Sequence, residues 1–423
     1  MNRILVIDNT RIRICIVCVM ALLSAPVCAQ FPASLLLSGD TAWRSKSTVF
    51  FIGGEAGISS NAVDVEFLDK SLLGGYLEND HLRQLASKMP SQACVGYRAN
   101  AQAELMNFRD TLLGNSNIGM RAALSTNYGG FVGFRPNLFK TVYLGNAGYA
   151  GTNTELGAID AQQQMWQKFG FGLFDKTTLS GFTLSLVEGQ SYQSLNLSHA
   201  DLYTSLGGDS LSLFLEGSFT RSDTARIGWA NGSGIGACLD FDYNILLPDG
   251  NGLASVTVRN LGFIAWNEKT ERYSVNETIR WNGVDVSDWV SGITDSIALP
   301  QYADSLNRDR KQASLVTSLP TTIAFRYLKK WKQHHYWEIG TLFIPNRASV
   351  PQIYAGMMHA ITPRLWIAER LSYGGYGELA LGVELQWLSK QSWFVKAGSS
   401  QVEGWLLPMA GGRNVYVNLG KNF

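Results

Sequence analysis

The feature that most constrains this chain is an alternation of apolar and polar side chains with a period of two residues. Segments 239–243, 254–259 and 379–387 each place an apolar residue at every second position, with small or polar residues between them. Successive side chains of a strand point to opposite faces, so each segment is expected to be a β-strand with one apolar face. No apolar run after residue 30 reaches the roughly 18 residues typical of a membrane-spanning helix.

Two all-β architectures fit this alternation. A soluble sandwich would bury the apolar faces between two sheets. A transmembrane barrel would turn them to lipid and turn the polar faces to a lumen. The alternating segments run about nine to eleven residues, which is the length of a tilted membrane strand. Aromatic residues also fall at or near the segment ends, as in the interfacial girdles of membrane barrels: Tyr243, Trp266, Tyr327, Trp337, Trp387 and Trp393.

The end of the chain gives a third argument for a barrel. The last alternating segment runs into Phe423, and this resembles the assembly signal of Gram-negative outer-membrane barrels. That resemblance implies outer-membrane lipid and the barrel-assembly machinery as partners. Lys421 departs from the apolar face, but a lysine at an interface can snorkel to water. We therefore expect a transmembrane antiparallel β-barrel of about 14 strands, and an even number between about 12 and 16.

Composition agrees with this expectation and excludes other classes. Charged residues make up 16% of the chain and hydrophobic residues 46%, so the chain is too apolar and too weakly charged to be disordered. A formal net charge of +1 argues against nucleic acid as a partner.

The first 29 residues have the pattern of a secretory signal peptide. Arg3, Arg11 and Arg13 precede an apolar core over 14–23, and Val27-Cys28-Ala29 supplies small residues for cleavage before Gln30. The alternative is an uncleaved anchor helix, but the apolar core is short for one. We expect residues 30–423 to form the mature barrel, exported to the outer membrane of a Gram-negative bacterium.

Residues 64–89 interrupt the alternation with helical spacing. Asp64 is a candidate N-cap, Gly74-Gly75 splits the segment into two short helices, and Pro90 follows the end. Such a pair could be a plug in the lumen, a periplasmic ledge or a helix pair on the barrel rim. It could fill space or act as a hatch.

The longest polar stretch covers residues 268–312. Long loops of outer-membrane barrels face the outside, so this stretch is the first candidate for an extracellular loop. Trp281 and Trp289 could give it a small core of its own.

No motif predicts catalysis, a cofactor or a metal. Gly232–Ala237 fits a loose dinucleotide pattern, but the following residues look like a strand where that pattern needs a helix. The five histidines form no metal-ligand motif, and no G-x-S-x-G elbow is present. Cys94 and Cys238 remain after signal removal and could pair in an oxidising compartment. We expect no enzyme activity.

The charged residues on the polar faces are more informative. We expect ten of them to face the lumen: Glu216, Asp240, Asp242, Arg259, Arg326, Glu338, Arg370, Glu378, Glu384 and Lys396. Unpaired charges in a narrow lumen are costly, so these residues should form a paired network or contact water. The network could be a structural filling, or it could be a polar path or docking surface for a solute.

Several segments together resemble a large, mostly uncharacterised family of Bacteroidota outer-membrane barrels. These are 144–147, 170–172, 239–243, 260–267 and the strand that ends at Phe423. That family is similar in layout to long-chain fatty-acid transporters and to barrel components of the gliding-type secretion system. The Asn-Pro-Ala motif of the transporters has no counterpart here beyond Phe31-Pro32-Ala33. The resemblance therefore implies fold and location rather than the transporter hatch.

Two functions follow as hypotheses. The first is a plugged channel that binds or passes a hydrophobic or small amphipathic solute. The second is a structural or secretion-accessory barrel that docks a protein partner.

Overall fold

The computed structural model describes residues 48–423, except 110, 113, 224, 227, 229, 230, 282–309 and 391. The predicted signal peptide, residues 1–29, lies outside the described residues. No helix in the described part of the chain is both long and apolar enough to cross a membrane.

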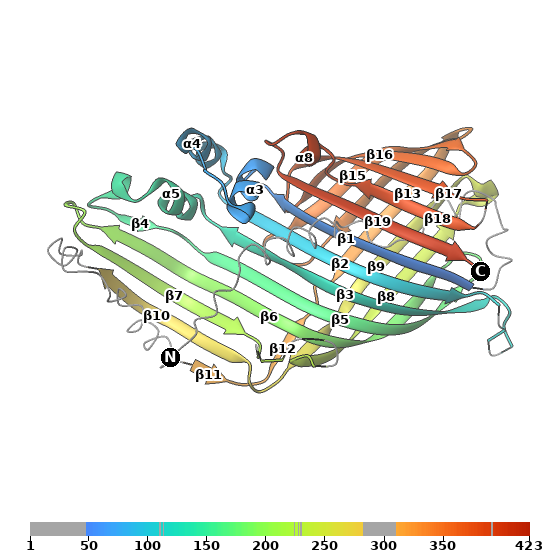
Figure 1. Cartoon of the computed structure of the whole chain (residues 1–423), viewed down its shortest axis with the longest axis horizontal. Coiled ribbons are helices and arrows are strands. Elements are labelled where there is room, and N and C mark those ends of the chain that lie inside the picture. Colours follow the sequence, from blue (N-terminus) through green and yellow to red (C-terminus); the bar gives the residue numbers. More distant parts are fainter. Residues whose placement is uncertain are drawn as a thin grey trace, which may run out of the picture.

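Fourteen antiparallel strands close into a barrel, which confirms the predicted fold class and strand number (Figure 1). The wall strands, in order around the barrel, are β1 (Thr48–Ser60), β2 (Ala93–Asn107), β3 (Ile118–Phe134), β5 (Ile159–Asp175), β6 (Gly181–Thr204), β8 (Gly234–Leu246), β9 (Gly252–Trp266), β13 (Thr322–Lys332), β14 (His335–Phe343), β15 (Val350–Thr362), β16 (Leu365–Gly375), β17 (Leu379–Leu388), β18 (Trp393–Ser399) and β19 (Gly412–Asn422). β19 pairs with β1 from Val49↔Asn422 to Ser59↔Gly412, and this pairing closes the wall.

The two ends of the barrel differ in their connections. The end where β1 begins and β19 finishes carries short turns, such as 333–334 and 363–364, and one 3₁₀ turn, η3 (Pro248–Gly250). The opposite end carries the long connections and all the described α-helices: α3 (Val65–Leu73), α4 (Asn79–Lys88), α5 (Pro136–Leu144) and α8 (Glu403–Leu406), together with the 3₁₀ turn η2 (Ala147–Tyr149). We call these the short-turn end and the long-loop end.

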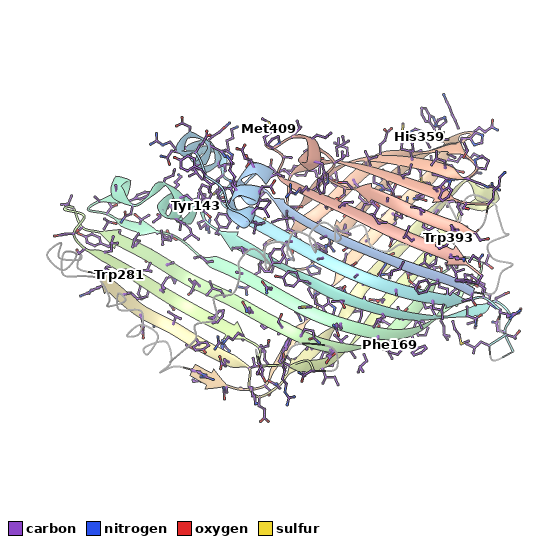
Figure 2. The ribbon with its side chains drawn as sticks, in the orientation of Figure 1. Tyr143, Phe169, Trp281, His359, Trp393 and Met409 are labelled. Atoms are coloured by element: carbon purple, nitrogen blue, oxygen red, sulfur yellow. The ribbon has the colours of Figure 1, made fainter. Side chains whose placement is uncertain are left out.

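The wall strands carry the predicted two faces, and β17 is the clearest case. Leu381, Val383 and Leu385 are exposed on the outside, whereas Glu384 and Gln386 are buried inside. Figure 2 shows Phe169 and Trp393 on the outer face of other strands, where both side chains are exposed. The wall thus has the apolar exterior that a lipid environment requires.

Five of the six predicted girdle residues lie on the outer face toward the short-turn end: Tyr243, Tyr327, Trp337, Trp387 and Trp393. The prediction for Trp266 is wrong, because this side chain points inward and is 1% exposed. The cause is a β-bulge at Asn260, a residue with φ of 56°, where the β8–β9 register shifts. An extra residue in one strand reverses the faces of every residue beyond it.

The segment 64–89 is helical, with the predicted start and break. The Asp64 side chain accepts a hydrogen bond from the Phe67 amide at 2.9 Å, and α3 ends at Gly74. α3 and α4 belong to the β1–β2 connection and lie on the rim of the long-loop end (Figure 1). Of the three predicted positions, the structure therefore has the rim.

A sheet extension leaves the wall at β6. Residues 181–189 of this strand pair with β8, whereas residues 193–204 pair with β7 (Leu211–Arg221). β7 pairs in turn with β10 (Glu271–Trp281), which pairs with β11 (Arg310–Gln312), and β4 (Asn153–Glu155) flanks β6. We call the second half of β6 with β4, β7, β10 and β11 the wing. Figure 2 shows Trp281 at its far tip.

The predicted loop 268–312 is thus partly strand, in β10 and β11. Residues 282–309, which include Trp289, lie outside the described residues. β12 (Leu315–Ser318) then returns the chain to the wall beside β9.

Candidate lumen site

The lumen is filled by an apolar layer at the short-turn end. Its buried members come from nine wall strands and two of their connections: Val49, Met106, Phe108, Phe174, Leu179, Leu253, Leu328, Tyr336, Met358, Trp366, Ala368 and Phe394. Aromatic contacts tie the layer together, including Tyr336 with Trp366 at a ring-centroid distance of 5.6 Å. The interior of the barrel is therefore closed by side chains at this end.

A charge network lies directly next to the apolar layer, on the side of the long-loop end. On β13, β14 and β18 the next inward-facing residue after Leu328, Tyr336 and Phe394 is charged: Arg326, Glu338 and Lys396, respectively. Such a position is two residues along the strand, so the two layers are stacked along the barrel axis.

One half of this network is centred on Glu338 and Glu384. Arg326 Nε lies 2.8 Å from Glu338 Oε1, and Arg370 donates to both carboxylates at 3.1 Å. Glu384 also accepts from the Tyr416 hydroxyl at 2.7 Å and lies 3.4 Å from Lys396 Nζ. All these charges have partners, as charges in a barrel interior must, and all but the partly buried Arg370 are buried.

The other half is centred on Asp240 and Asp242. Arg259 and Arg121 donate to the two oxygens of Asp242 at 2.6 Å and 3.1 Å. Lys168 donates to Asp240 Oδ2 at 2.5 Å. The other oxygen of Asp240 accepts from the Asn260 amide at 2.8 Å, so this carboxylate also holds the β9 bulge.

The structure brings together eight of the ten predicted lumen charges: Asp240, Asp242, Arg259, Arg326, Glu338, Arg370, Glu384 and Lys396. Glu378 has the inward parity of β17 but sits exposed in the turn before that strand begins. Glu216 lies exposed on β7, in the wing. Both predictions are wrong, because parity along a strand does not say where the wall ends or which strands belong to it.

Sequence reasoning missed Glu104, Arg121, Lys168 and Tyr416. A signal for them exists, since Arg121 shares its parity with Ser125 and Asn127 along β3. Applying the two-residue period to every wall strand would have placed these residues in the lumen.

A cavity of about 380 Å³ lies above the charge network, toward the long-loop end. Glu55 and Arg98 line it from β1 and β2, with Arg98 Nε 3.9 Å from Glu55 Oε1. Asp160 and Arg347 form a second opposite-charge pair at 3.8 Å, and the Arg347 side chain is largely exposed. The Arg347 side of the cavity is therefore its mouth.

Tyr376 forms part of the cavity wall from the β16–β17 turn. Its ring stacks on Phe131 at 6.5 Å, and its hydroxyl accepts from Asn346 Nδ2 at 2.6 Å. The ring fits because residue 96 is glycine, where a Cβ would lie 2.2 Å from the ring atoms. The cavity thus combines aromatic surface with polar groups.

Two buried polar side chains that line the cavity have an unsatisfied atom. Gln164 Oε1 and Trp166 Nε1 have no hydrogen-bond partner among the described residues, and their side chains come from the same inward face of β5. One atom is an acceptor and the other a donor. Buried polar atoms of this kind are normally satisfied, so they mark a place where a ligand or water binds.

A second, smaller cavity of about 60 Å³ separates the two halves of the charge network. Glu104, Arg121, Asp242, Arg326 and Lys396 line it. It has room for water but not for a solute of several heavy atoms.

The remaining sequence motifs have structural roles. Gly234 opens β8, so a strand and not a helix follows the glycine-rich segment 232–237. A Cβ at Gly189 would lie 2.7 Å from the Trp266 ring, so the glycines here make room for that side chain. Cys94 and Cys238 are both buried and free. The described residues contain no group of three or more His, Cys, Asp or Glu that could hold a metal ion.

Comparison with known families gives one decisive match. Residues 44–387 match the model of a family of unknown function, DUF5723. The chain belongs to this family. No curated protein matches the DUF5723 chain.

Solved barrels share only a loose likeness with this DUF5723 protein. The P. putida toluene transporter TodX is 10% identical, with a TM-score of 0.37 and 93% of each chain covered. A Pseudomonas aeruginosa FadL homologue is 8% identical, with a TM-score of 0.38, 96% of this chain and 95% of that chain covered. The translocator domain of the autotransporter NalP from Neisseria meningitidis is 10% identical, with a TM-score of 0.29, and 89% and 88% covered. Likeness at this level assigns no function.

Proposed function

We propose that this protein is an outer-membrane barrel that binds a small amphipathic solute in the 380 Å³ cavity. The observation that carries the proposal is the pair of unsatisfied buried atoms, Gln164 Oε1 and Trp166 Nε1, at the side of that cavity. A ligand group with one donor and one acceptor, such as an amide or a hydroxyl, would satisfy both.

The remaining lining supports an uncharged, partly apolar ligand. Tyr376, Phe131, Leu319 and Pro345 offer apolar surface. The nearby charges come as opposite pairs, Glu55 with Arg98 and Asp160 with Arg347. Pockets of this composition bind by apolar contact and use a few polar groups for orientation.

Location is part of the same proposal. The signal-peptide pattern of residues 1–29 and the apolar outer face of the wall support export to the outer membrane of a Gram-negative bacterium, of the Bacteroidota by resemblance. Barrels of that membrane have short periplasmic turns and longer extracellular loops. The short-turn end would then face the periplasm and the cavity mouth the outside. We propose a role in binding and not in catalysis, with no cofactor.

Binding can be tested with three probes of one chain length on the purified, folded barrel. Isothermal titration should show that hexanamide binds more tightly than hexanoate or hexane. Gln164→Leu should weaken hexanamide binding by about 5- to 30-fold, since it removes one hydrogen bond worth about 1–2 kcal/mol. Gln167→Leu is the matched control, because Gln167 is also buried on β5 but does not line the cavity. Equal binding of all three probes, or equal loss in both variants, would contradict the proposal.

A second candidate function rests on the wing. A solute site does not require a sheet that extends beyond the wall at β6. The extension favours a barrel that docks a protein, such as a secretion-system component. Pull-down from native outer membrane with the intact protein and with a variant whose β7 and β10 are deleted separates the two functions. A stoichiometric partner that is lost with the wing would support docking.

A further inference from the structure

The turn between β18 and β19 carries an unusual run of exposed apolar residues. Trp405, Leu406 and Met409 are 52%, 75% and 79% exposed, and Leu407 is exposed as well. Figure 2 shows Met409 on the outside of the rim, beside α8. Single exposed apolar residues are ordinary, but a run of them marks a surface that contacts lipid or another molecule.

This turn is fixed to the wall and not free to fold away. The Val402 amide donates to the Leu381 carbonyl at 2.8 Å, and the Glu403 carboxylate accepts from the Leu381 amide at 2.9 Å. The Trp405 indole donates to the Asn414 carbonyl at 2.8 Å. The exposed side chains therefore stand directly above the lipid-facing surface of β17 and β19.

Two cation–aromatic pairs on the outer face of β19 indicate the depth of this turn. Near the short-turn end, Lys421 Nζ lies 5.0 Å from the Trp393 ring centroid. Near the long-loop end, Arg413 Cζ lies 5.4 Å from the Trp405 ring centroid. Arg413 has the same outward parity as Lys421 and also pairs with Asp69 of α3, through Nη1 and Oδ2 at 2.9 Å.

The spacing of the two pairs along the membrane normal is slightly shorter than the apolar band of a membrane. Arg413 and Lys421 lie eight positions apart on β19, which is about 27 Å along a strand. With a tilt of about 35–45° this becomes roughly 20 Å along the membrane normal, against an apolar band of about 25 Å in outer-membrane barrels. Cations and tryptophans gather at both edges of such a band.

From this geometry we infer that the β18–β19 turn inserts Trp405, Leu406, Leu407 and Met409 into the outer lipid leaflet. The partner is the bilayer itself, because the apolar surface of the turn continues that of the lipid-facing wall. Lys421 with Trp393 marks one interface and Arg413 with Trp405 the other. The α3 helix, tied to Arg413 through Asp69, adds exposed Leu72 and Leu73 one turn further along the same rim.

Spin labels on the full-length barrel in vesicles of phosphatidylcholine and phosphatidylglycerol test this inference. Leu406→Cys and Met409→Cys each receive a nitroxide, and collision rates are measured with oxygen, which partitions into lipid, and with a soluble nickel complex. Leu381→Cys on β17 is the lipid reference. Leu206→Cys, 84% exposed in the β6–β7 turn of the wing, is the water reference. Wild type, in which Cys94 and Cys238 are buried, gives the labelling background.

The oxygen-to-nickel ratio at 406 and 409 should be several-fold higher than at 206 and close to that at 381. A ratio at both positions equal to that at 206 would overturn the inference and leave the turn free for a protein partner. Heat-modifiable gel migration verifies that each variant is folded, and the two positions serve as independent tests. Neither position lines the lumen cavity, so this result does not depend on the proposed binding function.

Discussion

At the scale of single residues, each lumen charge pairs with others, so neutralising one of them should lower the stability of the barrel. Glu384 has two cations and the Tyr416 hydroxyl within 3.4 Å and is fully buried. If this carboxylate were neutral, buried Lys396 would lose its carboxylate partner, and Arg370 would keep only Glu338. Breaking a buried pair by removing one partner costs about 3–5 kcal/mol.

Glu384→Gln should therefore lower the free energy of unfolding by about 3–5 kcal/mol in urea titrations of the barrel in lipid vesicles. Glu378→Gln is the matched control, because Glu378 is exposed in the turn just before β17, the strand that carries Glu384. That variant should change stability by less than about 0.5 kcal/mol. Equal effects of the two substitutions would show that the network is not a stabilising unit.

Single residues also show how much of the lumen lining could be predicted from the sequence. The structure has eight of the charges selected by parity in the lumen, because all eight lie on wall strands at positions where no bulge has reversed the faces. Parity failed at Trp266 since one extra residue at Asn260 reverses the faces beyond it. The Asp240 carboxylate that holds this bulge lies on another strand, and a single-strand pattern carries no such information.

At the scale of elements, each wall strand places its outward-facing residues at different depths along the barrel axis. Val383 lies midway along β17, whereas Leu379 begins the strand at the long-loop end.

The strand number followed from the length of the chain, and the helix pair from its spacing and its Asp64 cap. The wing was not predicted, because β7 and β10 alternate like wall strands and only pairing partners distinguish them.

A charge on the outside of β17 should cost more in the middle than at the end. Val383→Arg should destabilise the barrel in vesicles by about 2–4 kcal/mol, and Leu379→Arg by about 0–1 kcal/mol. Urea titration of each variant measures the difference. Equal costs at the two depths would contradict the assignment of β17 as a membrane-spanning strand.

The wing should loosen in acid. Burial alone would raise the pKa of Glu271, but hydrogen bonds from Tyr273 and Arg221, and the charges of Arg221 and Arg310, lower this pKa below its usual range. A carboxylate with a depressed pKa stabilises the folded state above its unfolded pKa of about 4.3, and this contribution is lost as pH falls below that value.

Limited proteolysis with pepsin should thus cut the wing faster at pH 3 than at pH 5, while the wall stays intact. Glu271→Gln should be cut at nearly the same rate at both values, after correction for the intrinsic activity of the protease on an unfolded substrate. A wild-type wing that resists cleavage equally at both pH values would show that the Glu271 contacts do not hold it.

At the scale of the whole molecule, the barrel is closed at its short-turn end and is not an open pore. The apolar layer closes the lumen at the short-turn end, the charge network lies above it, and the solute cavity lies toward the long-loop end. The alternation of the sequence predicts a barrel with a polar interior. It does not predict the closed end, because Tyr336, Met358 and Trp366 occupy inward positions that the period assigns to polar groups.

Ion conductance across a planar bilayer tests this account most directly. Purified wild-type barrel should insert without stable current steps, and Trp366→Ala combined with Tyr336→Ala should produce them, because the two rings contact each other within the apolar layer. Stable current steps from the wild-type barrel would contradict a lumen that is closed at the short-turn end.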